Sequence, residues 1–188
     1  MIFNEGDAVE GVYFVYKGIV KVHKKWGSEK ELIIRFASNG SIFGHRGLGG
    51  DNLYPISATA LEDSVICYMD IDFFESTLRV NTEFTYKLMM FFASELQESE
   101  RKMRNLAHMS VKGRVAQALI SLKTQFGSKE DGSINIELSR QDLASYAGAT
   151  YETVFRVLNE ILKEGIIESA GKKIFIKNQE KLSELTAE

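Results

Sequence analysis

Short apolar runs separated by turns dominate the chain up to about residue 70. Runs rich in β-branched and aromatic residues are typical of strands, and glycine between them indicates turns. Many short strands joined by turns predict a small antiparallel barrel or roll. The predicted strands are residues 12–16, 19–22, 32–36, 41–43 and 64–69.

The spacing of apolar residues becomes helical near residue 70. Asp70 precedes a short apolar run and predicts a helix with an acidic cap. Between Thr82 and Leu106 there is no glycine or proline, and apolar residues recur every three or four positions. This spacing is that of a coiled coil, so it predicts a long helix with a dimer seam, although an ordinary core helix would show a similar stripe. The stripe consists of Leu88, Phe92, Leu96, Ser99, Met103 and Leu106.

The C-terminal part reads as helices followed by a hairpin. An amphipathic helix is predicted from about Ser110 to Phe126, ended by Gly127, and a short strand over residues 134–136. Two further runs, residues 166–169 and 173–176, alternate around Gly171 and predict a β-hairpin.

Residues 139–162 have the pattern of two helices joined by a sharp turn. Ser139 and Asp142 form a box-like helix start, Gly148 allows the turn, and Thr150 caps the second helix. The second helix carries one apolar face of Val154, Val157, Leu158, Ile161 and Leu162. Its opposite face begins with Tyr151, Glu152, Phe155 and Arg156. Such a mixed polar face at the start of a helix can enter a DNA major groove, since Arg can pair with guanine and Glu with cytosine. A helical hairpin without a DNA role is the alternative.

The overall charge does not indicate DNA binding, but its distribution permits it. The formal net charge is -3. Residues 1–107 carry 12 Lys and Arg against 15 Asp and Glu, whereas residues 108–178 carry 10 against 8. The C-terminal part is therefore mildly cationic.

The single cysteine and the lengths of the apolar runs exclude several kinds of site and a membrane-spanning segment. The single Cys67 excludes an intramolecular disulfide and a four-cysteine metal or iron–sulfur site, and its apolar run predicts a buried position in a strand. No apolar run is long enough to span a bilayer, and the start lacks the pattern of a signal peptide. A cytoplasmic location without membrane contact is predicted.

At these residues the chain resembles the family of the cyclic-AMP receptor protein and the fumarate–nitrate reduction regulator, CRP/FNR. The resemblance covers nearly the whole chain and implies an effector-binding β-roll, a dimerisation helix, a winged helix-turn-helix and RNA polymerase as a partner. The similar segments are residues 4–7, 12–18, 39–44, 105–107, 113–116 and 139–144, and residues 152–154 with Arg156.

The resemblance also implies an effector pocket, whose residues depart from the cyclic-nucleotide pattern. Where those members have a Glu for the ribose, this chain has His45, followed by Arg46. Where they have an Arg pair for the phosphate, it has Tyr54 and Pro55. The pocket candidates are Phe43, Gly44, His45, Arg46, Tyr54, Pro55, Ser99 and Glu100.

These departures predict that the chain does not respond to cyclic AMP. The phosphate needs a buried cation, for which Arg46 is the candidate substitute, and Glu100 beside Ser99 would repel an anion. The iron–sulfur cysteines are absent, and His23, His45 and His108 offer no paired ligands for haem. No cofactor and no metal site are expected.

The resemblance fixes the expected boundaries. We expect an α+β protein with a β-roll over residues 1–80, a dimerisation helix over 81–107 and a winged helix-turn-helix over 108–188. Family members have a helix and a strand before the part that matches Ile2–Gly6, so the roll is expected to be short at its start and to have an exposed edge.

The predicted function is a dimeric, sequence-specific transcription regulator of palindromic DNA, controlled by an unknown effector or constitutively active. Relatives that read a TGTGA half-site have an Arg at the position of Tyr151, so a TTGA-like or otherwise altered half-site is expected. The alternative is a small-molecule-binding β-roll protein or an enzyme, but no catalytic constellation supports an enzyme. The predicted DNA contacts are Ser139, Arg140, Thr150, Tyr151, Glu152, Thr153, Phe155, Arg156 and Lys173.

Overall fold

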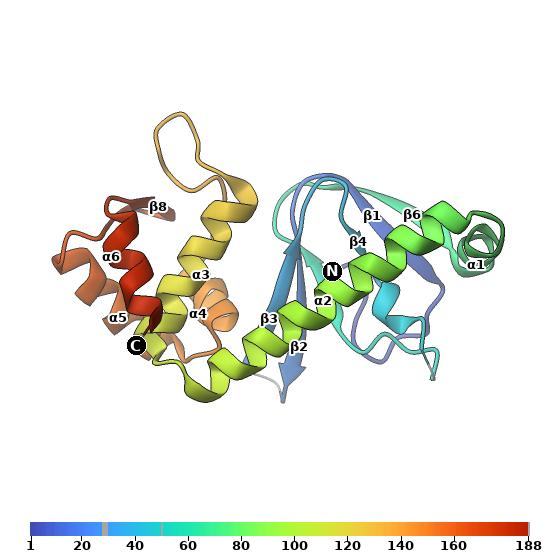
Figure 1. The fold of residues 1–188 in the computed structure, drawn as a ribbon, viewed down its shortest axis with the longest axis horizontal. Coiled ribbons are helices and arrows are strands. Elements are labelled where there is room, and N and C mark those ends of the chain that lie inside the picture. Colours follow the sequence, from blue (N-terminus) through green and yellow to red (C-terminus); the bar gives the residue numbers. More distant parts are fainter. Residues whose placement is uncertain (28–29, 50, 188) are drawn as a thin grey trace. The chain divides into compact units, whose positions relative to one another are not determined.

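The computed structural model describes residues 1–27, 30–49 and 51–187. It divides into two compact units, Met1–Glu98 and Ser99–Glu188 (Figure 1). The strands of the predicted roll lie in the N-terminal unit and the C-terminal unit is mostly α, as the expected α+β class requires. The long helix α2, Thr82–His108, is confirmed within one residue at each end, and the boundary between the units falls inside it.

The N-terminal unit contains two three-stranded antiparallel sheets. Their orders are β4–β1–β6 and β3–β2–β5. The strands are β1 (Gly11–Lys17), β2 (Val20–Trp26), β3 (Lys30–Ala37), β4 (Ile42–Phe43), β5 (Ser57–Ala60) and β6 (Val65–Asp70). The five predicted strands are confirmed, whereas β5 was not predicted.

Alternation along the strands places one row of apolar side chains between the sheets. On β2, Val20 and Val22 are fully buried, while Lys21 between them is only partly buried. They pack with Val15, Phe43 and Ala58 in one core cluster. This core is the reason why the short strands close into a roll.

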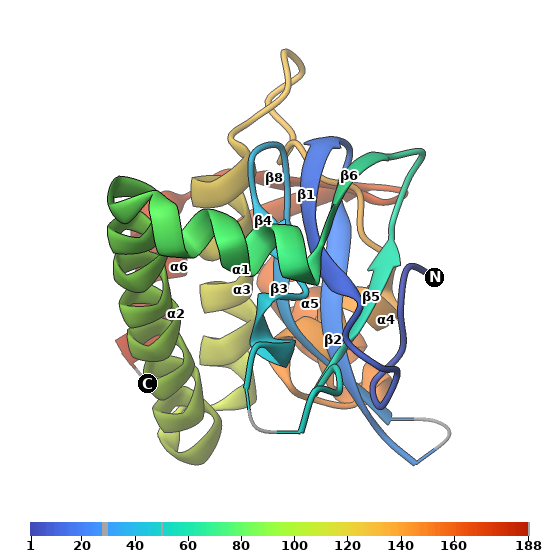
Figure 2. The ribbon, with the colours of Figure 1, turned by 90° about the vertical axis from the view of Figure 1, so that its right-hand side faces the viewer.

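Two helices cover the outer side of the first sheet. Asp70 caps α1 (Ile71–Val80) as predicted, accepting a hydrogen bond from the N–H of Asp72 at 2.9 Å. Phe74 of α1 and Leu88 of α2 pack with Val12 and Ile42 in a second core cluster. Figure 2 shows α1 lying across the strands.

The C-terminal unit contains four α-helices and a hairpin in its described residues beyond α2. They are α3 (Val111–Phe126), α4 (Arg140–Ala147), α5 (Tyr151–Lys163), β7 (Ile167–Ala170), β8 (Lys173–Ile176) and α6 (Gln179–Glu184), followed by the 3-10 turn η2 (Leu185–Ala187). The predicted helix over 110–126 and the predicted hairpin are confirmed. The helix α6 was not predicted, because its residues are mostly polar and show no apolar stripe.

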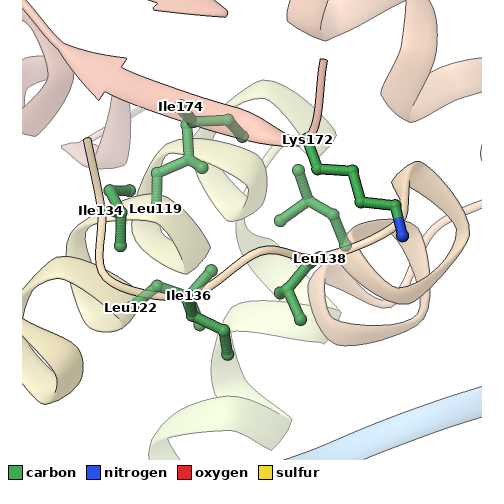
Figure 3. A pocket seen from close by; sticks show the side chains of 8 residues that line it. Leu119, Leu122, Ile134, Ile136, Leu138, Lys172 and Ile174 are labelled. Carbon is green, nitrogen blue, oxygen red and sulfur yellow. The ribbon is translucent and has the colours of Figure 1, made fainter. Parts of the chain in front are cut away.

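Two predictions about single segments were wrong. Residues 134–136 do not form a strand: only Ile134 makes an isolated bridge, to Ser128. Ile134 and Ile136 are buried in an irregular segment, where they line a small apolar hollow with side chains of α3 and β8 (Figure 3). Cys67 lies in a strand as predicted but is exposed, because β6 is the outer strand of its sheet.

Candidate functional site

The turn between α4 and α5 is fixed by caps on both sides. The hydroxyl oxygen of Ser139 accepts a hydrogen bond from the N–H of Asp142 at 2.9 Å and so caps α4. Gly148 ends α4 with a φ of 64°, a left-handed conformation that glycine tolerates. Thr150 then caps α5 by accepting a hydrogen bond from the N–H of Thr153 at 3.4 Å. The predicted helix–turn–helix is therefore confirmed.

Arg114 of α3 holds this turn from behind. Its guanidinium donates to the carbonyl oxygens of Ala147 at 3.0 Å and Gly148 at 3.3 Å, where α4 ends. It also donates to the carbonyl oxygen of Met109 at 2.8 Å. These contacts fix α3 and the turn to each other. This role of Arg114 could not be predicted from the sequence, because its two partners at the turn are backbone atoms more than 30 residues away along the chain.

The two faces of α5 differ sharply in burial. The face packed on the unit's core consists of Val154, Val157, Leu158 and Ile161, all buried. The opposite face of its first two turns consists of Tyr151, Glu152, Phe155 and Arg156, all exposed. The rings of Tyr151 and Phe155 stack with centroids 6.1 Å apart and planes 15° apart. The structure thus brings together four of the predicted DNA contacts on one exposed surface.

Arg140 connects α4 to the hairpin. Its guanidinium donates to the carbonyl oxygen of Gly171, at the tip of the β7–β8 turn, at 3.3 Å. It also interacts electrostatically with Tyr151 on α5. The side chain is half-buried, and burial lowers the pKa of its guanidinium. Arg140 therefore lies where α4, α5 and the hairpin meet.

The lysines of the hairpin are mostly engaged with acidic side chains. Lys173 pairs with Asp131 at 2.6 Å, and Lys177 pairs with Glu168 at 3.4 Å. The hydrogen bond from Lys173 holds the pKa of the Asp131 carboxyl below its usual range. The side chain of Lys172 lines the edge of the apolar hollow (Figure 3). Lys173, the predicted phosphate contact, is thus already paired with a carboxylate of the same chain.

The predicted effector pocket of the N-terminal unit is filled by aromatic side chains. Tyr54 is buried, and its ring stacks on Phe3 with centroids 3.9 Å apart. Its hydroxyl donates to the carbonyl oxygen of Gly11 at 2.7 Å. Phe43 is fully buried in the same cluster, whereas Pro55 is exposed. The side chain at the position of the expected phosphate-binding arginine is therefore part of the core.

His45 is buried against the first half of α2. It follows Gly44, which adopts a φ of 82°, and begins the short 3-10 helix η1 (His45–Gly47). Only 2% of the side chain is exposed, and its ring lies 5.2 Å from that of Phe91 and 5.3 Å from that of Phe92. Among the described residues, neither ring nitrogen has a hydrogen-bond partner. Burial, and then the nearby Arg35 and Arg46, lower the pKa of His45 to about 3, so its ring is neutral.

Arg46 and Arg35 both pair with a single carboxylate of α2. Glu95 of α2 lies 3.0 Å from the guanidinium of Arg46 and 3.2 Å from that of Arg35. The cation that could have substituted for the missing phosphate ligand is therefore already paired. Ser99 is partly buried and Glu100 is exposed, and both belong to the C-terminal unit.

Two family models match complementary parts of the chain. The cyclic nucleotide-binding domain matches residues 1–81, and the Crp-like helix-turn-helix domain matches residues 113–185. The anaerobic regulatory protein of Bacillus subtilis is 31% identical over 181 residues, covering 94% of this chain and 76% of that protein. The chain belongs to the CRP/FNR family of transcription regulators.

Other members of the CRP/FNR family match at similar levels. The cAMP-activated global transcriptional regulator CRP of Salmonella typhimurium is 30% identical over 181 residues, covering 93% of this chain and 84% of that protein. The solved structure of FixK2 from Bradyrhizobium japonicum matches with a TM-score of 0.87 and 27% identity, covering all of this chain and 92% of that one. The chain is thus a sequence-specific DNA-binding regulator of the CRP/FNR type, as the resemblance predicted.

The apolar stripe of this CRP/FNR regulator begins differently from the prediction. Leu88 is only 7% exposed and belongs to the core of its own unit, so it is not available to a second chain. The exposed Met89 continues the line of Phe92, Leu96 and Met103 instead. With Met89 in place of Leu88, and with Ser99 between Leu96 and Met103, the steps alternate regularly between three and four down to Leu106, which is also exposed.

Two negative findings concern the described residues of this CRP/FNR regulator. None of their helices combines the length and the apolar character that crossing a bilayer requires. Among the same residues, no three His, Cys, Asp or Glu side chains are grouped as they would be around a metal ion.

Proposed function

We propose that this CRP/FNR regulator binds palindromic double-stranded DNA as a homodimer, with one α5 reading each half-site. The observation that carries the proposal is the exposed face of α5, where Glu152 and Arg156 stand one helical turn apart beside the Tyr151–Phe155 stack. Side chains four residues apart project from one side of a helix. Arg156 can bond guanine O6 and N7 while Glu152 accepts from a cytosine amine.

The homodimer is supported by the exposed stripe on α2. Met89, Phe92, Leu96, Met103 and Leu106 are each at least 37% exposed, an unusual degree for apolar side chains aligned on one helix face. Two such helices side by side would remove this apolar area from water. A two-fold symmetric dimer presents two copies of α5, and this symmetry is what a palindromic site matches.

We propose further that cyclic AMP is not the effector. The reason is that the predicted pocket is occupied by the protein's own side chains, and the candidate cation for the phosphate is already paired. Tyr54 is packed in the core, Arg46 is paired with Glu95, and His45 is neutral and covered by two phenylalanine rings. The regulator is controlled by another effector or is constitutively active. Calorimetry with cyclic AMP should show no binding at micromolar concentration, and nucleotide-enhanced DNA affinity would contradict this proposal.

The remaining parts of the proposal follow from DNA binding itself. A regulator that acts on genomic DNA works in the cytoplasm, and contact with RNA polymerase is how members of this family are expected to affect transcription. No catalytic activity is part of the proposed function.

Selection from random DNA pools with the purified protein tests the proposed function. We expect enrichment of a palindrome whose two half-sites lie about one helical turn apart. Each half-site should contain a G·C pair, with an altered, TTGA-like sequence in place of TGTGA. Enrichment of no sequence, or only of an unpaired motif, would contradict the proposal.

A further inference from the structure

An aromatic pair on the DNA-reading face of α5 has no role in the fold. Tyr151 is 41% exposed and Phe155 is 49% exposed, whereas the buried side of the helix is taken by Val154, Val157, Leu158 and Ile161. Their stacked rings form one flat apolar surface between polar neighbours. Leaving apolar area in water is unfavourable, so a surface of this kind marks a place where another molecule binds.

The chemistry of a DNA groove limits what this surface can recognise. Phe155 has no polar side-chain atom, so it can donate or accept no hydrogen bond at a base edge. In the major groove the bases present mainly hydrogen-bond donors and acceptors, and the one bulky apolar group among them is the 5-methyl group of thymine. A methyl group is the feature that a phenyl ring can favour there by contact.

The two rings lie beside the proposed base-reading side chains of α5, and this indicates which base pair carries the methyl group. Glu152 and Arg156 directly follow Tyr151 and Phe155 in the chain, so each ring has a base-reading side chain as its neighbour on the helix. The rings would therefore contact the pair next to the G·C pair that Arg156 and Glu152 read.

We propose that the Tyr151–Phe155 pair reads the 5-methyl group of a thymine adjacent to the G·C pair of each half-site. This inference rests on the proposed function, because it requires α5 to enter the major groove. It adds to the proposed function that the aromatic pair selects thymine and does so through the 5-methyl group.

The test replaces single thymines of the selected palindrome by deoxyuridine, which removes the methyl group and keeps base pairing. At the thymine next to the G·C pair we expect the dissociation constant to rise about fourfold per half-site, the value for burying one methyl-sized group. Thymines elsewhere in the site should tolerate the replacement. Fluorescence anisotropy titrations measure each constant, and 5-bromouracil at the sensitive position should restore binding because bromine fills a similar space.

Variants of the protein assign the effect to the two rings. Phe155→Ala and Tyr151→Ala should bind thymine and uracil sites equally, while Tyr151→Phe should keep the preference because the ring remains. Glu152→Gln is the matched control: it should alter the G·C preference and leave the thymine-to-uracil ratio unchanged. Both rings are exposed, so thermal unfolding should confirm that the alanine variants fold.

Different outcomes separate this inference from the proposed function. If selection yields no specific DNA, the proposed function fails. If a palindrome is found but uracil and thymine bind alike at every position, the methyl-reading role is wrong and the DNA function stands. If the double variant Tyr151→Ala/Phe155→Ala binds the site as tightly as the natural protein, the pair is a protein-docking surface instead.

Discussion

Arg156 is the residue from which most of the sequence specificity should come. It is exposed on α5 and, within the described residues, makes no hydrogen bond or ion pair that would have to be broken before it meets a base. Arg156→Ala should cost about 1–3 kcal/mol per half-site and relax the preference at one base pair. Titrations against all four base pairs at that position measure both effects. If the affinity falls uniformly, with no change in preference, Arg156 contacts a phosphate.

His45 should make the free energy of unfolding of the N-terminal unit depend on pH. Its folded-state pKa is about 3, against 6.5 for the free side chain. Below pH 6.5 the unfolded chain therefore binds a proton that the folded chain does not, and the free energy of unfolding falls as the pH falls towards 3. Above pH 6.5 both states are neutral at this residue and its effect vanishes.

The size of the pH effect is testable by denaturant unfolding between pH 7.5 and pH 5. A single histidine of this kind contributes up to about 1.4 kcal/mol per pH unit below 6.5. The His45→Gln variant should lack this part of the slope, and the difference between the two proteins isolates His45 from the other histidines. Equal slopes would mean that His45 accepts its proton in the folded state.

Lys173 of β8 is paired with Asp131, and this changes the expectation for the hairpin. If Lys173 contacts a phosphate, Lys173→Ala should weaken binding to all sequences alike and flatten the salt dependence by about 0.9 in slope per lost contact. Asp131→Asn would release the same ammonium group and should strengthen binding. An exposed ion pair stabilises the fold little, so neither change should unfold the protein. A Lys173→Ala variant with an unchanged salt slope would assign the lysine to the Asp131 pair alone.

At the scale of elements, the stripe on α2 should decide the oligomeric state. Leu96→Glu with Met103→Glu places two charges in the seam of each helix, so we expect a monomer that binds the palindrome weakly. Ser94→Glu is the matched control, because residue 94 is exposed on the side of the helix away from the stripe. Sedimentation equilibrium measures the mass of both variants. An unchanged dimer in the double variant would place the interface elsewhere.

Elements whose signals are local were the ones that sequence predicted well. The caps of α4 and α5 and the turn at Gly148 depend on residues within three positions of each other, so their pattern is complete in the sequence. β5 was missed because Ser57–Ala60 consists of small residues, and only pairing with β2 makes it a strand. Residues 134–136 alternate like a strand, yet their burial comes from packing in an irregular segment.

The candidate sites show the same division between local and tertiary signals. The exposed face of α5 follows from helical periodicity alone. The choice between Leu88 and Met89 at the start of the stripe required knowing which side of α2 packs on the sheet. Likewise, the pairing of Arg46 with Glu95 and the hold of Arg114 on the turn join residues 33 to 49 positions apart, which periodicity cannot reveal.

At the scale of the whole molecule, the dimer seam and the two recognition helices must act together. In the proposed dimer, the seam on α2 joins two chains that each carry one α5, so we expect the affinity for DNA to depend on the spacing of the two half-sites. Moving the half-sites apart by five base pairs turns one of them to the opposite side of the duplex, since a turn takes about 10 base pairs.

We therefore expect that inserting five base pairs at the centre of the palindrome lowers the affinity to about that of a single half-site. Loss of the second, linked contact should weaken binding roughly a hundredfold or more, since linkage contributes about 10²–10⁴. A spacer of the original length with a scrambled sequence controls for indirect effects of the central bases. The monomeric Leu96→Glu/Met103→Glu variant should bind both spacings equally, because it has no second helix to place. If the natural dimer also tolerates the insertion, its two DNA-binding units are not held by the seam.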